Sequence, residues 1–134
     1  MKKEDCLFCK IVAGEIPCHK IYEDAKFLAF LDISPVNKGH TLIIPKKHSR
    51  NILEMNETLL GEMMVLVKKI SNNIKTQLKA DGINIMSNNE AEAGQIIFHT
   101  HIHIIPRFKE DGFHHWSGKA YTEGEIEETQ KILK

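Results

Sequence analysis

The chain has little of what would mark a secreted, membrane-spanning or nucleic-acid-binding protein. Eighteen basic residues balance eighteen acidic ones, and a formal net charge of +0 gives no general attraction to DNA, RNA or an anionic membrane. No apolar run approaches the roughly 20 residues that span a bilayer, and residues 1–6 lack the apolar stretch of a secretory signal. Three cysteines are too few for a disulfide framework. We therefore expect a cytoplasmic protein without nucleic-acid or membrane partners.

The pattern of apolar residues predicts a single α+β domain over residues 1–134. No repeat, low-complexity tract or linker divides the sequence, and its length suits one core. Apolar runs between turn residues predict strands at 18–23, 27–31, 41–44 and 83–86, and a last strand from 97 to 106. Apolar residues at three- and four-residue steps predict a long helix from 56 to about 79. With a helical turn at 6–12 and a terminal helix at about 123–133, this order favours an antiparallel sheet.

Histidine is abundant, and three of the eight histidines fall within five residues. If His99, His101 and His103 lie on a strand, they form a row on one face, with about 6.5 to 7 Å between successive Cα atoms. Such a row suits a metal site completed by a third ligand from elsewhere. It equally suits a nucleophilic middle histidine whose neighbour stabilises phosphoryl oxygens or protonates a leaving group. The residues alone leave both interpretations open.

Other positions suit polar ligands but have simpler explanations. Asp32 lies between two apolar residues at a strand end, where it can bind a ligand or cap the turn that follows. Gly94 lets the backbone approach a phosphate closely because it has no Cβ. The Cys6-x-x-Cys9 pair is weak evidence by itself. A redox role is disfavoured, because no strand can precede Cys6 as in a thioredoxin-like unit.

The segment from His99 to Ile105, preceded by Ala93-Gly94-Gln95, resembles the signature that names the histidine triad (HIT) family. Residues 6–11, 15–17, 29–35 and 39–46 are also similar to family segments and follow the family's order. The likeness is closest to bacterial Hit proteins and the Hint branch. It implies a HIT-like fold, with an antiparallel sheet of about five strands, one long helix and a C-terminal helix. It also implies a homodimer formed through the long helix and the strand before the 87–95 loop.

The resemblance implies roles for the histidines and for a nucleotide pocket. His101 would attack the α-phosphate and form a covalent nucleotidyl intermediate, His103 would bind phosphate oxygens and assist the leaving group, and His40 would be a fourth active-site histidine. Asp32 would accept hydrogen bonds from the ribose hydroxyls. The nucleotide-contacting residues implied are Phe8, Ile11, Phe30, Asp32, Ile33, Asn88, Gly94, Gln95, His101 and His103.

Some HIT relatives hold a structural zinc, and the matching positions here are Cys6, Cys9, His48 and His99. Two thiolates and two imidazoles form a closed tetrahedral set that leaves no place for water. In this interpretation the first triad histidine, His99, serves the ion while His101 serves the phosphate. The resemblance implies no organic cofactor.

The sequence therefore predicts a hydrolase of purine nucleotides, acting on AMP or GMP joined to an amine, an acyl group or a second nucleotide. A dinucleoside polyphosphate hydrolase of the same fold is the nearest alternative. Ile96 stands where many nucleoside phosphoramidases carry Ser or Thr, so a zinc-stabilised nucleotide-binding or interaction protein with little turnover is a second alternative. A metal-dependent hydrolase is a third. The tail from 112 to 134 cannot be aligned with relatives from the sequence.

Overall fold

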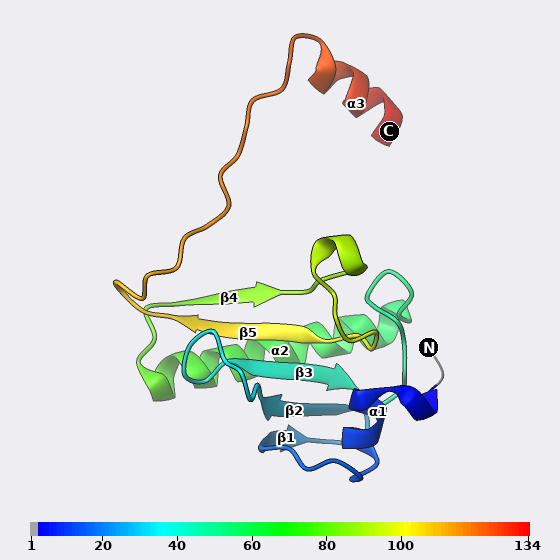
Figure 1. Cartoon of the computed structure of the whole chain (residues 1–134), viewed down its shortest axis with the longest axis vertical. Coiled ribbons are helices and arrows are strands. Elements are labelled where there is room, and N and C mark those ends of the chain that lie inside the picture. The colour runs from blue at the N-terminus through cyan, green and yellow to red at the C-terminus, as the bar shows by residue number, and fades with distance from the viewer. Residues whose placement is uncertain (1–2) are drawn as a thin grey trace.

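The computed structural model describes residues 3–134 and contains one five-stranded antiparallel sheet with three α-helices (Figure 1). The helices are α1 (Leu7–Val12), α2 (Glu57–Leu78) and α3 (Glu125–Leu133), and short 3-10 helices occupy Lys3–Asp5 and Ala91–Ala93. The strands are β1 (Lys20–Glu23), β2 (Phe27–Leu31), β3 (Thr41–Pro45), β4 (Gly82–Met86) and β5 (Ile102–Arg107). Their order in the sheet is β1-β2-β3-β5-β4. This confirms the expected α+β class, the long helix and the terminal helix.

Helix α2 covers one face of the sheet and forms the larger core. It begins after Asn56, whose side chain accepts a hydrogen bond from the Leu59 N–H at 3.0 Å and so caps the first turn. Met63, Val67 and Ile74 of this helix are buried against the sheet. The opposite face is covered at β2 and β3 by α1 and the residue before it. Both faces of the central strands are therefore apolar, and α1 lies on the face opposite α2.

The last strand begins at Ile102, so the expected start at residue 97 is wrong. Pairing between β3 and β5 ends at the Ile43–Ile102 pair. Beyond it Pro45 has no N–H to donate, and its carbonyl accepts a hydrogen bond from His99 Nε2 at 2.7 Å. The Thr100 N–H donates instead to the Ser49 carbonyl at 2.8 Å. The first two triad histidines therefore lie on irregular backbone before the strand.

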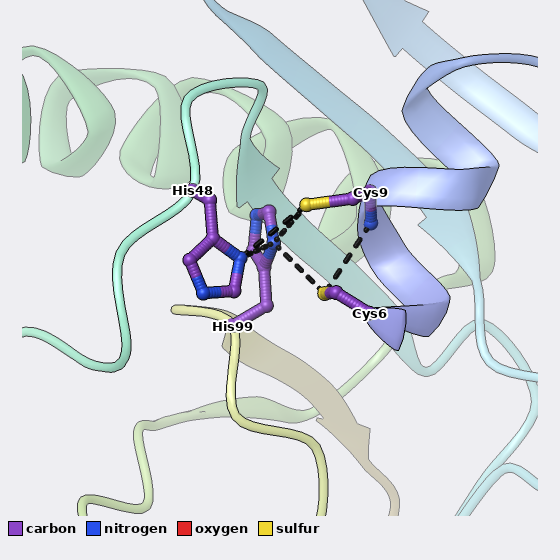
Figure 2. Close-up of side chains that lie close together, drawn as sticks. All are labelled: Cys6, Cys9, His48 and His99. Atoms are coloured by element: carbon purple, nitrogen blue, oxygen red, sulfur yellow. Dashed lines mark hydrogen bonds between the residues drawn. The ribbon is translucent and has the colours of Figure 1, made fainter. Parts of the chain in front are cut away.

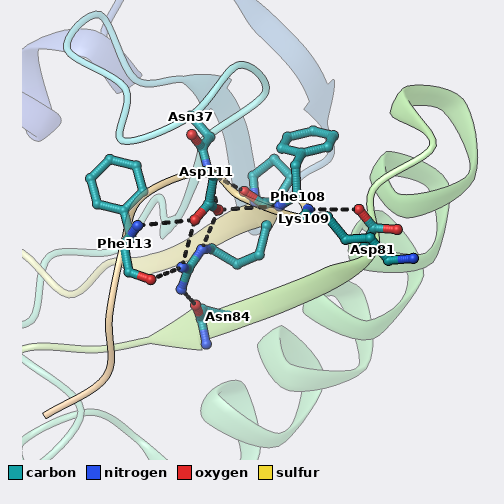
Figure 3. Close-up of polar contacts among 9 residues, drawn as sticks. Asn37, Asp81, Asn84, Phe108, Lys109, Asp111 and Phe113 are labelled. Atoms are coloured by element: carbon teal, nitrogen blue, oxygen red, sulfur yellow. Dashed lines mark hydrogen bonds and ion pairs between the residues drawn. The ribbon is translucent and has the colours of Figure 1, made fainter.

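A polar network holds the point where the C-terminal tail leaves the sheet (Figure 3). Arg107, at the end of β5, donates two hydrogen bonds to Asp111 at 2.8 and 3.0 Å and one to Asn84 of β4 at 2.7 Å. Asn37 also donates to Asp111, at 3.0 Å. Residues 112–124 then run away from the sheet toward α3 (Figure 1). Within the described chain α3 buries none of its residues, and Trp116 is 93% exposed.

Candidate active site and metal centre

Two cysteines and two histidines from distant parts of the chain meet beside α1 (Figure 2). Cys6 precedes the helix and caps it, because its Sγ accepts a hydrogen bond from the Cys9 N–H at 3.4 Å. The α1 turn thereby places both thiols at the same end of the helix. His48 comes from the loop after β3 and His99 from the segment before β5. Cys6 and His99 are fully buried.

The distances among these four side chains fit a tetrahedral zinc ion. His48 Nδ1 and His99 Nδ1 are 3.2 Å apart. Cys9 Sγ lies 3.3 Å from His48 Nδ1 and 3.5 Å from His99 Nδ1, and Cys6 Sγ lies 3.4 Å from His99 Nδ1. Zinc bonds of about 2.0 to 2.1 Å to nitrogen and about 2.3 Å to sulfur give tetrahedral separations of about 3.3 to 3.6 Å for nitrogen–nitrogen and sulfur–nitrogen pairs. The hydrogen bond from His99 Nε2 to the Pro45 carbonyl leaves the lone pair on Nδ1, directed at the cluster. The four expected donors are therefore adjacent, and the Nδ1 lone pair of His99 is directed at them.

Backbone contacts determine which nitrogen of His101 carries the proton. Its Nδ1 lies 2.7 Å from the His99 carbonyl oxygen, which can only accept, so the proton is on Nδ1. The lone pair of the neutral ring is then on Nε2, the arrangement that a nucleophilic imidazole needs. The ring is 8% exposed and packs edge-on against Phe8, at 5.1 Å between centroids. His99, one of the expected zinc ligands, thus holds the candidate nucleophile through its main chain.

The same reasoning applies to the pair formed by His40 and His103. The Val36 N–H donates to His40 Nδ1 at 3.0 Å, so the proton of the neutral ring is on Nε2. His40 Nε2 then donates to His103 Nδ1 at 2.9 Å, which leaves an N–H on His103 Nε2. Asp32 Oδ2 lies 3.7 Å from His40 Nε2. Although these three side chains are close enough to share an ion, Val36 keeps His40 Nε2 protonated and so disfavours a metal there.

Burial keeps all three of these histidines neutral near pH 7. It lowers the pKa of His101, against smaller opposing effects of the His99 carbonyl and the Asp32 charge. Burial, together with the neighbouring His101 and His40, lowers the pKa of His103 from 6.5 to about 4. Burial also lowers the pKa of His40, opposed by Asp32. His101 can therefore act as a neutral nucleophile, and His103 can act as a neutral hydrogen-bond donor.

An apolar cavity of about 370 Å³ lies next to these histidines and brings together five of the expected pocket residues. Those residues are Phe8, Ile11, Phe30, Asp32 and Ile33. The volume falls within the range of small-molecule sites, about 300 to 1,000 Å³. Both phenylalanines are nearly buried and pack edge to face at 5.6 Å, whereas Ile33 is 89% exposed at the rim. The cavity therefore offers an aromatic wall and a single carboxylate.

The expected phosphate-contacting residues lie in the 87–97 loop that follows β4. Asn88 is half-buried and its Nδ2 donates to the Gly94 carbonyl at 3.4 Å. Gly94 has φ +92°, a conformation that glycine adopts readily. Gln95 is only 4% exposed. The oxygen and the nitrogen of its side-chain amide both form hydrogen bonds within the protein. Asp32 Oδ1 accepts from the Ser34 N–H at 2.8 Å, so this carboxylate caps the turn and also faces His40.

Sequence reasoning missed several residues that the structure places at the site. Val36 acts through its backbone N–H, which no side-chain pattern reveals. Leu42 and Ile97 line the cavity, and alternation along β3 would have placed Leu42 on the same face as Ile44, beside α1. Arg50 and Glu90 join the 87–97 loop to the segment after His48. The pairing of Arg50 with Glu90 has no signal in the sequence because it links loops 40 residues apart.

Fold and site together define a small α+β domain whose clustered histidines lie on β5, before it, and on either side of β3. The HIT domain model matches residues 13–110. The protein named Protein hit from Bacillus subtilis is 51% identical over 111 residues, covering 82% of this chain and 77% of that protein. The chain therefore belongs to the HIT family, as its triad signature indicated. Among residues 3–134, no helix is long and apolar enough to cross a bilayer.

Two other relatives carry names that describe a reaction. Adenylylsulfatase HINT3 of Arabidopsis thaliana is 49% identical over 109 residues, which are 81% of this chain and 55% of that protein. Adenosine 5'-monophosphoramidase hnt1 of Schizosaccharomyces pombe is 43% identical over 106 residues, covering 79% and 77% of the two chains.

Solved structures agree with the fold over almost the whole chain. SMU.412c from Streptococcus mutans UA159 matches with a TM-score of 0.89 at 47% identity, covering 99% of this chain and 88% of that one. A histidine triad family protein from Mycobacterium smegmatis, described as Zn-bound, matches with a TM-score of 0.78 at 34% identity, covering 98% and 92%.

Proposed function

We propose that the chain is a nucleotide hydrolase that cleaves a bond at the α-phosphate of a purine nucleotide through a covalent intermediate on His101. The observation that carries the proposal is the His101 ring itself. It is neutral, it is held through Nδ1 by the His99 carbonyl, and it packs against Phe8, which lines an apolar cavity with one carboxylate. The adenylylsulfatase and AMP-phosphoramidase names of two relatives support the same class of reaction.

In the proposed reaction the purine ring enters the cavity between Phe8 and Phe30, and Asp32 accepts hydrogen bonds from the ribose. His101 Nε2 attacks the α-phosphorus and forms a P–N bond, while the bond to the leaving group breaks; the leaving group takes the electron pair and, where it is an amine, a proton from solvent. The N–H on His103 Nε2 donates to a phosphoryl oxygen. Water then attacks the phosphorus and gives up a proton to solvent, while the P–N bond breaks, its electron pair returns to His101 Nε2 and the nucleotide is released. The rate enhancement comes from positioning His101 against the α-phosphorus and from electrostatic stabilisation of the transition state.

We also propose that the Cys6, Cys9, His48 and His99 cluster holds a structural zinc ion. Two imidazole lone pairs that face each other at 3.2 Å repel unless a cation or a proton lies between them. The ion would join α1 to the segment that carries the nucleophile. The Zn-bound relative from Mycobacterium smegmatis supports this assignment.

Intact-mass measurement after brief incubation with an adenosine phosphoramidate tests the central proposal. We expect wild type to gain the mass of one AMP group, His101→Ala to gain none, and His114→Ala, which changes an exposed tail histidine, to match wild type. Hydrolysis that continues without an adduct in His101→Ala would show that the nucleophile is wrong and favour a metal-centred reaction. A diadenosine polyphosphate in the same assay distinguishes the alternative leaving group.

A binding protein with little turnover is the second candidate. Ile96 follows the Gly-Gln pair, is 85% exposed, and has no hydroxyl to donate to phosphate or to a leaving group. Tight AMP binding without an adduct would support this candidate. Replacement by serine, Ile96→Ser, should raise turnover if the missing hydroxyl limits the reaction.

We propose a homodimer through α2 and β4. β4 is an edge strand, and Ile85 of this strand is 49% exposed, as expected for a strand that continues into a second sheet. Met64 of α2 is 41% exposed and lies beside Ile85 in a surface hollow between the helix and β4. Light scattering should give the mass of a dimer for wild type and of a monomer for Ile85→Lys, while Ile132→Lys in the tail should leave the dimer intact.

A further inference from the structure

The backbone of Glu90 has a conformation that glycine adopts far more readily than any other residue. Its φ is 79° and its ψ is 159°, and it immediately precedes the 3-10 helix of the 87–97 loop. Residues with a Cβ are strained in this region and remain there only where the surrounding structure holds them, often at ligand sites. Contacts elsewhere in the protein must therefore hold Glu90 in this conformation.

Three hydrogen bonds from the 48–52 segment hold the Glu90 carboxylate. Arg50 donates from Nε at 2.9 Å and from Nη2 at 2.8 Å, and Asn51 donates from Nδ2 at 2.6 Å. These contacts lower the pKa of Glu90 to about 2. The Arg50 guanidinium also lies 4.3 Å from the centre of the Phe98 ring. A bidentate contact restricts geometry far more than a single surface ion pair does.

Gln95 extends this contact through the loop. Its Oε1 accepts from the Glu90 N–H at 2.9 Å and from Asn51 at 3.2 Å, while its Nε2 donates to the carbonyls of Arg50 at 2.7 Å and Ile97 at 3.1 Å. Because its side-chain donors and acceptor are used within the protein, the Gln95 amide holds the loop in place. The 87–97 loop and the 48–52 segment lie side by side in Figure 1.

Both ends of the 87–97 loop reach the site. The Ser87 hydroxyl donates to the carbonyl of His101 at 3.5 Å, and Ile97 lines the nucleoside cavity. Beyond Ile97 the chain runs through irregular backbone to His101, where no β-sheet pairing of the described residues fixes it. A shift of the loop would therefore move the phosphate position, the cavity wall and the nucleophile together.

We propose that Arg50, Asn51 and Glu90, the Glu90 clamp, are positioning residues that hold the 87–97 loop and the His101 segment in the geometry that receives a nucleotide phosphate. The inference rests on the proposed function. The clamp does not touch the substrate, and it acts by stabilising a strained backbone that places Asn88 and Gly94 beside the phosphate.

Two substitutions separate a positioning role from simple relief of strain. Glu90→Ala removes the carboxylate and keeps the strain, whereas Glu90→Gly removes both, because glycine adopts this conformation readily. Glu62→Gln is the matched control, since Glu62 is an equally exposed acid paired with Lys26 at 2.7 Å on α2. We expect Glu90→Gly to melt at a higher temperature than Glu90→Ala. In both, kcat/KM for an adenosine phosphoramidate should fall about 10- to 100-fold through loss of alignment, while the control matches wild type and bound zinc is unchanged.

Two results would overturn the proposal. Wild-type kcat/KM in Glu90→Gly would show that the clamp only compensates strain, and loss of zinc together with activity would place the effect at the metal centre. Hydrogen exchange of the 87–97 amides needs no substrate, so it tests the clamp even if wild type fails to hydrolyse the phosphoramidate. Exchange there should accelerate in Glu90→Gly and not in Glu62→Gln; unchanged exchange would refute the clamp whatever the reaction proves to be.

Discussion

Acid should lower the free energy of unfolding because His103 binds a proton more readily in the unfolded chain than in the folded protein. Its pKa is about 4 in the folded protein against 6.5 for an unperturbed histidine, with burial as the main cause. Between these values the unfolded chain binds the proton and the folded chain does not, so the free energy of unfolding falls as the pH falls. If the whole pKa shift were expressed, it would lower the free energy of unfolding by about 3 kcal/mol. Because solvent reaches this half-buried ring, we expect a smaller decrease of about 1 to 2 kcal/mol.

Urea unfolding of wild type and His103→Gln at pH 7 and pH 4.5, with zinc in excess, measures this contribution. His40 and His101 titrate together with His103, so the quantity compared is the change in each protein's free energy of unfolding between the two pH values. The decrease should be about 1 to 2 kcal/mol smaller in His103→Gln. His115→Gln, which removes an exposed tail histidine, is the control. If His103→Gln loses as much stability as wild type, the argument from burial is wrong.

Three further predictions concern the metal, the pocket wall and a turn. Chelation, or Cys9→Ser, should lower the free energy of unfolding by about 3 kcal/mol or more, and activity should be lost as the protein unfolds. Loss of activity without a change in melting temperature would instead indicate a catalytic metal. Phe8→Ala removes a side chain that is 3% exposed and packs on His101, so urea unfolding should show a loss of about 3 to 5 kcal/mol, and AMP binding should weaken. Gly39→Ala should cost about 1 to 3 kcal/mol, because residue 39 has φ +92° and an added Cβ would collide with the Leu78 side chain; an unchanged urea midpoint would contradict this.

Local patterns were sufficient for most of the fold. The helical period of apolar residues, with Asn56 as a cap, placed α2 within a residue or two of its observed limits of Glu57 and Leu78. Apolar runs bounded by turn residues placed β2, β3 and β4 in the same way. These signals work because side chains a few residues apart meet on one face of a helix or strand. The triad signature, being contiguous, also identified the family.

The start of β5 and the state of the histidines depended on contacts between distant segments. A local pattern extends the last strand to residue 97, but Pro45 cannot continue the ladder and Ser49 takes the Thr100 N–H instead. The proton on each histidine follows from one backbone partner, such as Val36 for His40, and a side-chain pattern does not record backbone hydrogen bonds.

By itself, then, the sequence determined the class of fold, the family and the residue types available for chemistry, because each can be recognised from residues close together in the chain. Only the tertiary structure decided how those residues are used. It brought Cys6 to His99 across 93 positions, which the sequence had suggested only through the family resemblance, and it paired Arg50 with Glu90. Such pairings depend on how the sheet and loops pack in three dimensions. They are favoured because burying polar groups costs free energy unless those groups form hydrogen bonds with one another.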